Sequence, residues 1–134
     1  EHNFTYSLYP HTGDYAEGGV VHRGYELNIP LSIHSCPSRE GTLPPSFSYM
    51  VVESSSVIIE TVKKAERGNE IIVRLYESSG EPCNTGLKLN FPVTKVFLVN
   101  LMEEPMGEIL VSDGRIELDF TPFEILTLKL STIR

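Results

Sequence analysis

The sequence predicts an all-β fold, a two-sheet antiparallel β-sandwich of about nine strands with one short helix after the first strand. Two observations support this prediction. Apolar and polar residues alternate along most of the chain, and turn-forming residues separate the alternating runs. Because alternation places one face of each strand against a core and the other in water, about nine strands need two packed sheets rather than one.

The amino-terminal third of the chain predicts the first strand, the helix and a loop. Residues 4–8 alternate Phe, Tyr and Leu with Thr and Ser, which is typical of a half-buried strand. Residues 16–28 carry apolar side chains at helical spacing, so we expect a short helix there. Gly18 and Gly19 weaken that helix, since each costs about 1 kcal/mol relative to alanine. Residues 35–45 contain three prolines and a glycine, which predicts a loop.

The remaining residues predict strands joined by turns. Asp113-Gly114 is typical of a two-residue type I′ turn, which needs positive φ at both central positions. Residues 67–69 predict a second hairpin turn, and residues 78–86, rich in turn formers, predict a connection. Residues 70–76 and 95–101 are apolar on both faces, so these segments are expected to be central strands. The other expected strands are residues 57–64, 87–91, 110–112, 116–120 and 126–130.

Size and charge limit the classes of function. The 134 residues are expected to form a single domain, residues 1–134. Strand patterns begin close to Glu1 and continue almost to Arg134, so we expect a segment of a longer polypeptide. The formal charge of −7, from 11 basic and 18 acidic side chains, disfavours nucleic-acid binding. No apolar run has the ~20 residues of a membrane helix, so no membrane partner is expected.

Neither metal binding nor catalysis is predicted for this chain. His34 and Cys36 lie two residues apart, but a recognisable zinc site needs four ligands, usually in two close pairs. Cys36 and Cys83 are predicted to be free thiols in a reducing compartment. No nucleophile motif is present, and most acidic residues fall on polar strand faces or in turns. We therefore expect no catalytic residue and no metal ligand here.

Two groups of residues are candidates for other roles. His11, Asp14 and Tyr15 lie in a loop that combines aromatic rings, an imidazole and a carboxylate. Such a loop could contact a sugar ring, although Asp14 is better explained as a cap for the following helix. Arg74 and Glu77 are candidates for a structural ion pair, because a charge on a central strand needs a partner.

Six stretches of the chain resemble, in order, signatures of the final domain of family 38 α-mannosidases, closest to the cytosolic and microbial branch. The first joins Phe-Thr-Tyr to Pro-His-x-Gly-Asp-aromatic, with Tyr15 where tryptophan is frequent in the family. The second has Gly24 where alanine is common. The stretches are distributed along nearly the whole chain: residues 1–15, 24–31, 57–66, 74–77, 100–104 and 120–125.

The resemblance implies the carboxy-terminal β-sandwich of a zinc-dependent, retaining exo-α-mannosidase, a cytoplasmic glycoside hydrolase that removes terminal α-mannose from glycans. It places the zinc ligands and the nucleophile on an amino-terminal barrel, so this chain alone is expected to be inactive and to bind no cofactor. Its expected partners are the remaining domains of the parent, with His11, Asp14 and Tyr15 as an interdomain or cleft contact. The alternative is an autonomous carbohydrate-binding module, although the chain has six tyrosines and no tryptophan.

Overall fold

The computed structural model describes residues 1–42 and 44–133, and the chain divides into two compact units after Thr42. The amino-terminal unit contains helix α1 (Val20–Asn28). The helix begins later than predicted because Gly19, its first flanking residue, has a positive φ of 63°. A turn over residues 15–19 therefore precedes the helix, and α1 has no buried residue.

The predicted first strand is absent from residues 1–42, all of which are described, so the helix precedes every strand. Residues 4–8 form neither helix nor strand, and Phe4 and Leu8 are 83% and 90% exposed. Alternation makes a segment suitable for a sheet, but the strand forms only where a neighbour supplies backbone hydrogen bonds. The amino-terminal unit contains no such neighbour.

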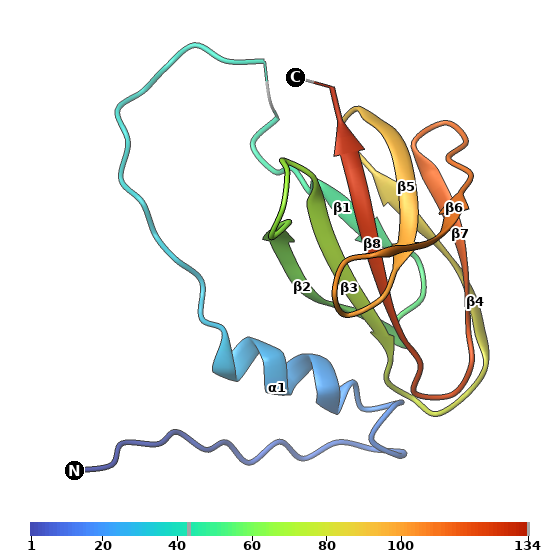
Figure 1. Ribbon diagram of the computed structural model, residues 1–134. Coiled ribbons are helices and arrows are strands. Elements are labelled where there is room, and N and C mark those ends of the chain that lie inside the picture. The colour runs from blue at the N-terminus through green and yellow to red at the C-terminus, as the bar shows by residue number, and fades with distance from the viewer. Residues whose placement is uncertain (43, 134) are drawn as a thin grey trace. The chain divides into compact units, whose positions relative to one another are not determined.

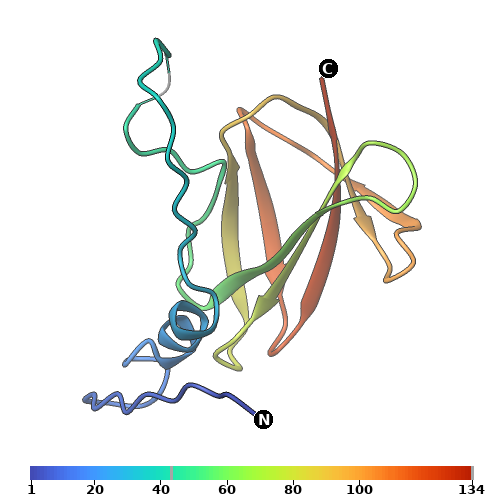
Figure 2. The same ribbon diagram turned by 90° about the vertical axis from the view of Figure 1, so that its left-hand side faces the viewer.

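The second unit is a sandwich of two antiparallel sheets (Figures 1 and 2). A three-stranded sheet has the order β1-β4-β7, and a five-stranded sheet has the order β2-β3-β8-β5-β6. All pairs of neighbouring strands are antiparallel. The strands are β1 (Met50–Val52), β2 (Val57–Lys64), β3 (Ile71–Glu77), β4 (Cys83–Leu89), β5 (Val93–Val99), β6 (Pro105–Ile109), β7 (Arg115–Phe120) and β8 (Ile125–Thr132).

The core lies between the two sheets and follows the predicted alternation. In the larger sheet, Leu128 pairs with Val73 on one side and Leu98 on the other, which makes one continuous apolar row. In the smaller sheet, Leu87 pairs with Ile116, and both are fully buried. Such rows of neighbouring side chains are the basic stabilising unit of a sheet. The all-β, two-sheet antiparallel prediction is confirmed, with eight strands in the described residues rather than nine.

The two segments predicted to be central strands, β3 and β5, both lie inside the larger sheet, on either side of β8 (Figure 1). Two details differ from the prediction. Strand β4 begins at Cys83, so the connection before it is shorter than expected. Strand β6 occupies residues 105–109, which are not among the predicted strands. Its position at the edge explains why a strand can begin with proline, which cannot donate to a neighbour.

The turn at Asp113-Gly114 has the predicted backbone, with φ values of 49° and 71°. Ser112 and Arg115 exchange two backbone hydrogen bonds across it, of 3.0 and 2.8 Å. The hairpin does not extend further, because β6 belongs to the larger sheet and β7 to the smaller one. This turn therefore carries the chain from one sheet to the other.

Candidate functional site

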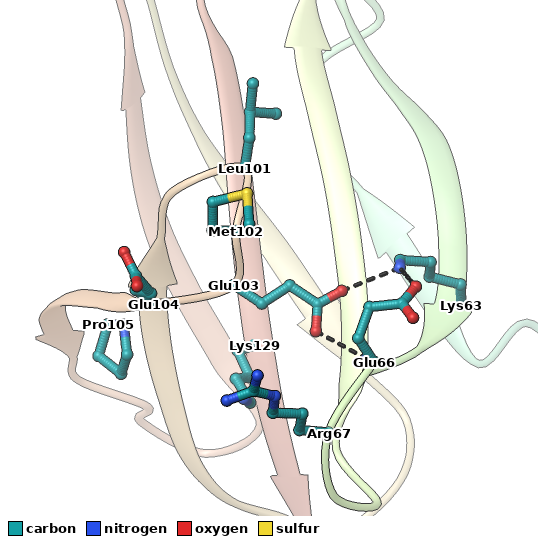
Figure 3. A pocket seen from close by; sticks show the side chains of 9 residues that line it. All are labelled: Lys63, Glu66, Arg67, Leu101, Met102, Glu103, Glu104, Pro105 and Lys129. Carbon is teal, nitrogen blue, oxygen red and sulfur yellow. Dashed lines mark hydrogen bonds and ion pairs between the residues drawn. The ribbon is translucent and has the colours of Figure 1, made fainter.

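A bridge of charged side chains crosses the outer face of the larger sheet. Lys63 on β2 forms ion pairs with Glu66, at 2.7 Å, and with Glu103, at 2.9 Å. Glu103 also accepts a hydrogen bond from the backbone N–H of Glu66, at 2.8 Å. Figure 3 shows Glu103 reaching from the β5–β6 connection toward Lys63. We call these three residues and the cavity beside them, of about 520 Å³, the ion-pair cavity.

The β5–β6 connection is shaped so that Glu103 can make this reach. The side-chain oxygen of Asn100 accepts the backbone N–H groups of Met102 and Glu104, at 2.9 and 3.0 Å. Its amide nitrogen donates to the Glu104 carboxylate at 2.8 Å. Glu103 itself has a φ of 63°, a conformation that is uncommon for residues other than glycine. Asn100 therefore closes the loop, and the loop holds Glu103 in an unusual backbone conformation.

The bridge lies over a buried residue of the outer face. Ile72 on β3 is only 1% exposed, although its neighbour Val73 is the residue that enters the core cluster. Successive strand residues point to opposite faces, so Ile72 faces away from the core. It pairs with Lys63 on one side and with Lys129 on the other, and both of these side chains line the ion-pair cavity. The charged side chains therefore cover the apolar side chain of Ile72.

Glu66 and Glu103, the two acids that bind Lys63, do not have the properties of a glycosidase pair. Hydrogen bonds from Lys63, and then from the Glu66 backbone, lower the pKa of Glu103 below its ordinary value, so it stays ionised. The same two carboxylates raise the pKa of Lys63. Glycoside hydrolysis needs one acid whose pKa is raised and a second carboxylate that is open to substrate. Here one ammonium group separates the two carboxylates, and the arrangement is a structural clamp.

The buried carboxylate of Glu77 joins two loops at one end of the sandwich. Glu77, the last residue of β3, is 0% exposed. One oxygen accepts the backbone N–H of Ser79 at 2.7 Å and also the Ser79 hydroxyl. The other oxygen accepts the N–H groups of Gly80, at 2.7 Å, and Phe123, at 3.1 Å. Burial raises the pKa of Glu77, but the hydrogen bonds outweigh it and hold that pKa at about 2. We call this arrangement the Glu77 anchor.

Glu77 binds backbone N–H groups of two loops instead of its predicted partner, Arg74. Arg74 and Glu77 are absent from the ion pairs of the described residues, and Arg74 donates instead to the Thr127 hydroxyl at 3.4 Å. Residues three apart on a strand point to opposite faces, so their side chains diverge. The buried charge is satisfied by backbone N–H groups, which are the commoner partners of an isolated buried carboxylate at a turn.

The loop of His11, Asp14 and Tyr15 is held by contacts within its own unit. Asp14 accepts the N–H groups of Ala16 and Glu17, at 2.8 and 2.9 Å. It therefore caps the turn that leads into α1 rather than the helix itself, which has no side-chain cap. His11 stacks on Tyr9 with ring centroids 5.8 Å apart. A Cβ at Gly18 would lie 2.4 Å from Nδ1 of His11, so the ring would have to move if the glycine were replaced.

No group of three or more His, Cys, Asp or Glu residues that could hold a metal ion occurs in residues 1–42 and 44–133. Cys36 and Cys83 are both free thiols. No helix in the described part of the chain is both long and apolar enough to cross a bilayer.

Lys63, Glu103 and Phe123 all lie in stretches that resemble the family, but the sequence does not indicate that Lys63 and Glu103 are in contact. The bond between Glu66 and Glu103 joins residues 37 positions apart, and nothing in the local pattern indicates it. One signal was available: both residues lie in stretches that resemble the same family.

Comparison with known proteins identifies relatives over nearly the whole chain. The family model described as the glycosyl hydrolases family 38 C-terminal beta sandwich domain matches residues 56–128. Alpha-mannosidase 2C1 of Homo sapiens is 38% identical over 134 residues, which cover 96% of this chain and 13% of that protein. Its Mus musculus counterpart is also 38% identical, with the same coverage. Alpha-mannosidase G of Dictyostelium discoideum is 32% identical and covers 96% of this chain and 12% of its own length. The chain therefore spans only about an eighth of these relatives' length.

Proposed function

Because the chain belongs to the carboxy-terminal β-sandwich domains of glycosyl hydrolase family 38, we propose that it is a non-catalytic domain of a zinc-dependent, retaining exo-α-mannosidase. The parent enzyme hydrolyses terminal α-mannose residues of glycans in the cytoplasm. Residues 1–134 act in it as one domain that packs against the other domains and partly shapes the active-site cleft.

One observation carries this proposal. Proteins named as α-mannosidases match 96% of this chain, yet the match covers only 12–13% of their own length. Most of such an enzyme, including room for its catalytic residues, therefore lies outside the matched part. The described residues also do not fit zinc, because they contain no cluster of metal ligands. We assign zinc and the catalytic carboxylates to the remainder of the parent.

The interactions within the sandwich support a scaffolding role. The ion-pair cavity fixes the β5–β6 connection on the outer face of the larger sheet, and the Glu77 anchor fixes two loops at one end. Both devices give loops a defined shape, as a surface that meets other domains requires. We assign the loop of His11, Asp14 and Tyr15 to a contact with the cleft or with a neighbouring domain.

The test is an activity assay on the isolated chain. The purified 134-residue chain should release no product from an aryl α-mannoside, with or without added zinc. The full-length parent, assayed beside it, provides the positive control. Turnover by the chain above the rate in buffer would overturn the proposal.

An autonomous carbohydrate-binding module remains the second candidate, because several aromatic rings are exposed. Tyr49 is 61% exposed and meets Phe47 edge to face, with ring centroids 5.0 Å apart. Perpendicular rings offer a sugar no shared flat face, which favours the scaffold. Calorimetric titration with mannose oligosaccharides separates the two, since saturable heat supports the module and its absence supports the scaffold.

A further inference from the structure

Phe123 is an exposed aromatic residue in a strained backbone conformation. It lies in the turn between β7 and β8, its side chain is 65% exposed, and its φ is 59°. A positive φ strains a residue that has a Cβ, and for a bulky side chain it is a true outlier. Glycine or asparagine would adopt this turn with less strain. The sandwich gains little burial from the ring, so packing inside this unit does not explain why a phenylalanine occupies the position.

Three separate features hold the ring where it is. The backbone N–H of Phe123 donates to the buried Glu77 carboxylate at 3.1 Å. The turn is closed by Glu124, whose carboxylate accepts the N–H and the hydroxyl of Thr121 at 2.7 and 2.8 Å. Gly80 leaves room for the ring, because a Cβ at this position would lie 2.6 Å from the ring carbon Cζ.

Backbone strain that the surroundings enforce clusters at sites that contact something else. We propose that Phe123 is an anchor residue that inserts into an apolar pocket on the remainder of the parent α-mannosidase. This inference rests on the proposed function and names the residue through which that contact is made. Rigid aromatic anchors of this kind supply much of the energy of protein interfaces.

The surroundings of the ring favour a protein partner over a sugar. A pyranose needs hydrogen-bonding groups beside the aromatic ring, in addition to the ring itself. The hydroxyls of Ser79 and Thr121, in the two loops that meet at the Glu77 anchor, already donate to Glu77 and Glu124. Ile125, two residues further along the chain, is 61% exposed and adds exposed apolar surface. The relatives supply the partner, since nearly nine-tenths of their length lies outside the matched part.

The inference predicts opposite consequences for the isolated chain and for the parent. Phe123→Gly removes the ring and relieves the positive φ, so the melting temperature of the 134-residue chain should stay the same or rise. The same substitution in the full-length parent should speed thermal inactivation of its mannosidase activity about tenfold, the effect of losing one anchor. Leu110→Ala, which removes an apolar side chain that is 88% exposed elsewhere, is the matched control and should change neither value.

Hydroxyl-radical labelling supplies an independent measurement. Phe123 should be labelled several-fold more slowly in the full-length parent than in the isolated chain. Equal labelling in both, or a Phe123→Gly chain that melts well below the wild type, would overturn the inference and leave the proposed function intact. Protection of Phe123 in the isolated chain by mannose oligosaccharides would assign the ring to sugar binding instead. Mannoside hydrolysis by the isolated chain would overturn the proposed function, and the inference with it.

Discussion

Replacing Glu77 with glutamine should destabilise the sandwich by about 3 kcal/mol near neutral pH. The carboxylate accepts three backbone N–H groups and one hydroxyl inside the protein. A glutamine amide can keep one oxygen toward Gly80 and Phe123, but its NH₂ group then faces the Ser79 N–H. That orphaned donor costs about 2 kcal/mol, and the loss of charge weakens the remaining bonds by about 1 kcal/mol more.

The dependence on pH gives this prediction a distinctive signature. The pKa of Glu77 is about 2 in the folded chain, below the ordinary value of 4.5, so the unfolded chain takes up the proton first. The stabilisation is therefore complete above pH 4.5 and is lost as the pH falls toward 2. The free energies of unfolding of the wild type and of Glu77→Gln should differ most near neutral pH and become similar in acid.

Thermal unfolding followed by circular dichroism measures the effect. For a chain of this size, about 3 kcal/mol corresponds to a fall in Tm of roughly 10 °C. Glu81→Gln makes the same change of charge at an exposed position of the neighbouring loop, and it should move the Tm by about 1 °C or less. A Glu77→Gln chain that melts with the wild type, or a difference that stays constant from pH 7 to pH 3, would show that the Glu77 anchor does not stabilise the fold.

Two further substitutions test the core and the ion-pair cavity. Leu128→Ala, at a fully buried position on the central strand, should cost about 3 kcal/mol in urea unfolding because it leaves a cavity, and a loss below 1 kcal/mol would contradict the assigned core. Lys63→Met removes the first cause of the lowered pKa of Glu103, so NMR titration of that carboxyl should show its pKa rising toward the ordinary range. Lys64→Met is the control, and an unchanged Glu103 pKa in the Lys63 variant would contradict the bridge.

Most of the sandwich could be predicted from the sequence, because most strands have an alternating or apolar pattern of their own. Strands β2, β7 and β8 lie where the alternating or apolar runs predicted them, and the turn at Asp113-Gly114 has the expected backbone. Residues 4–8 show the limit of the same reasoning. Their alternation is as regular as that of β8, but a strand also needs a neighbour, and periodicity does not report one.

The site was less predictable because its contacts are either long-range or made by the backbone. Lys63 and Glu103 come from opposite edges of the larger sheet, and only the resemblance to a family placed both in notable stretches. Glu77 was assigned to Arg74 because opposite charges are visible in a sequence, whereas backbone N–H groups are not. The period of two along a strand already argued against that pair, since it places residues three apart on opposite faces.

Deleting residues 1–134 from the full-length parent is the most direct test of the central claim. That claim is that the sandwich supports an enzyme whose catalytic residues lie in other domains. The shortened parent should still bind zinc but lose activity on an aryl α-mannoside, or inactivate much faster on warming. A shortened parent with unchanged kcat/KM and an unchanged rate of thermal inactivation would contradict the supporting role.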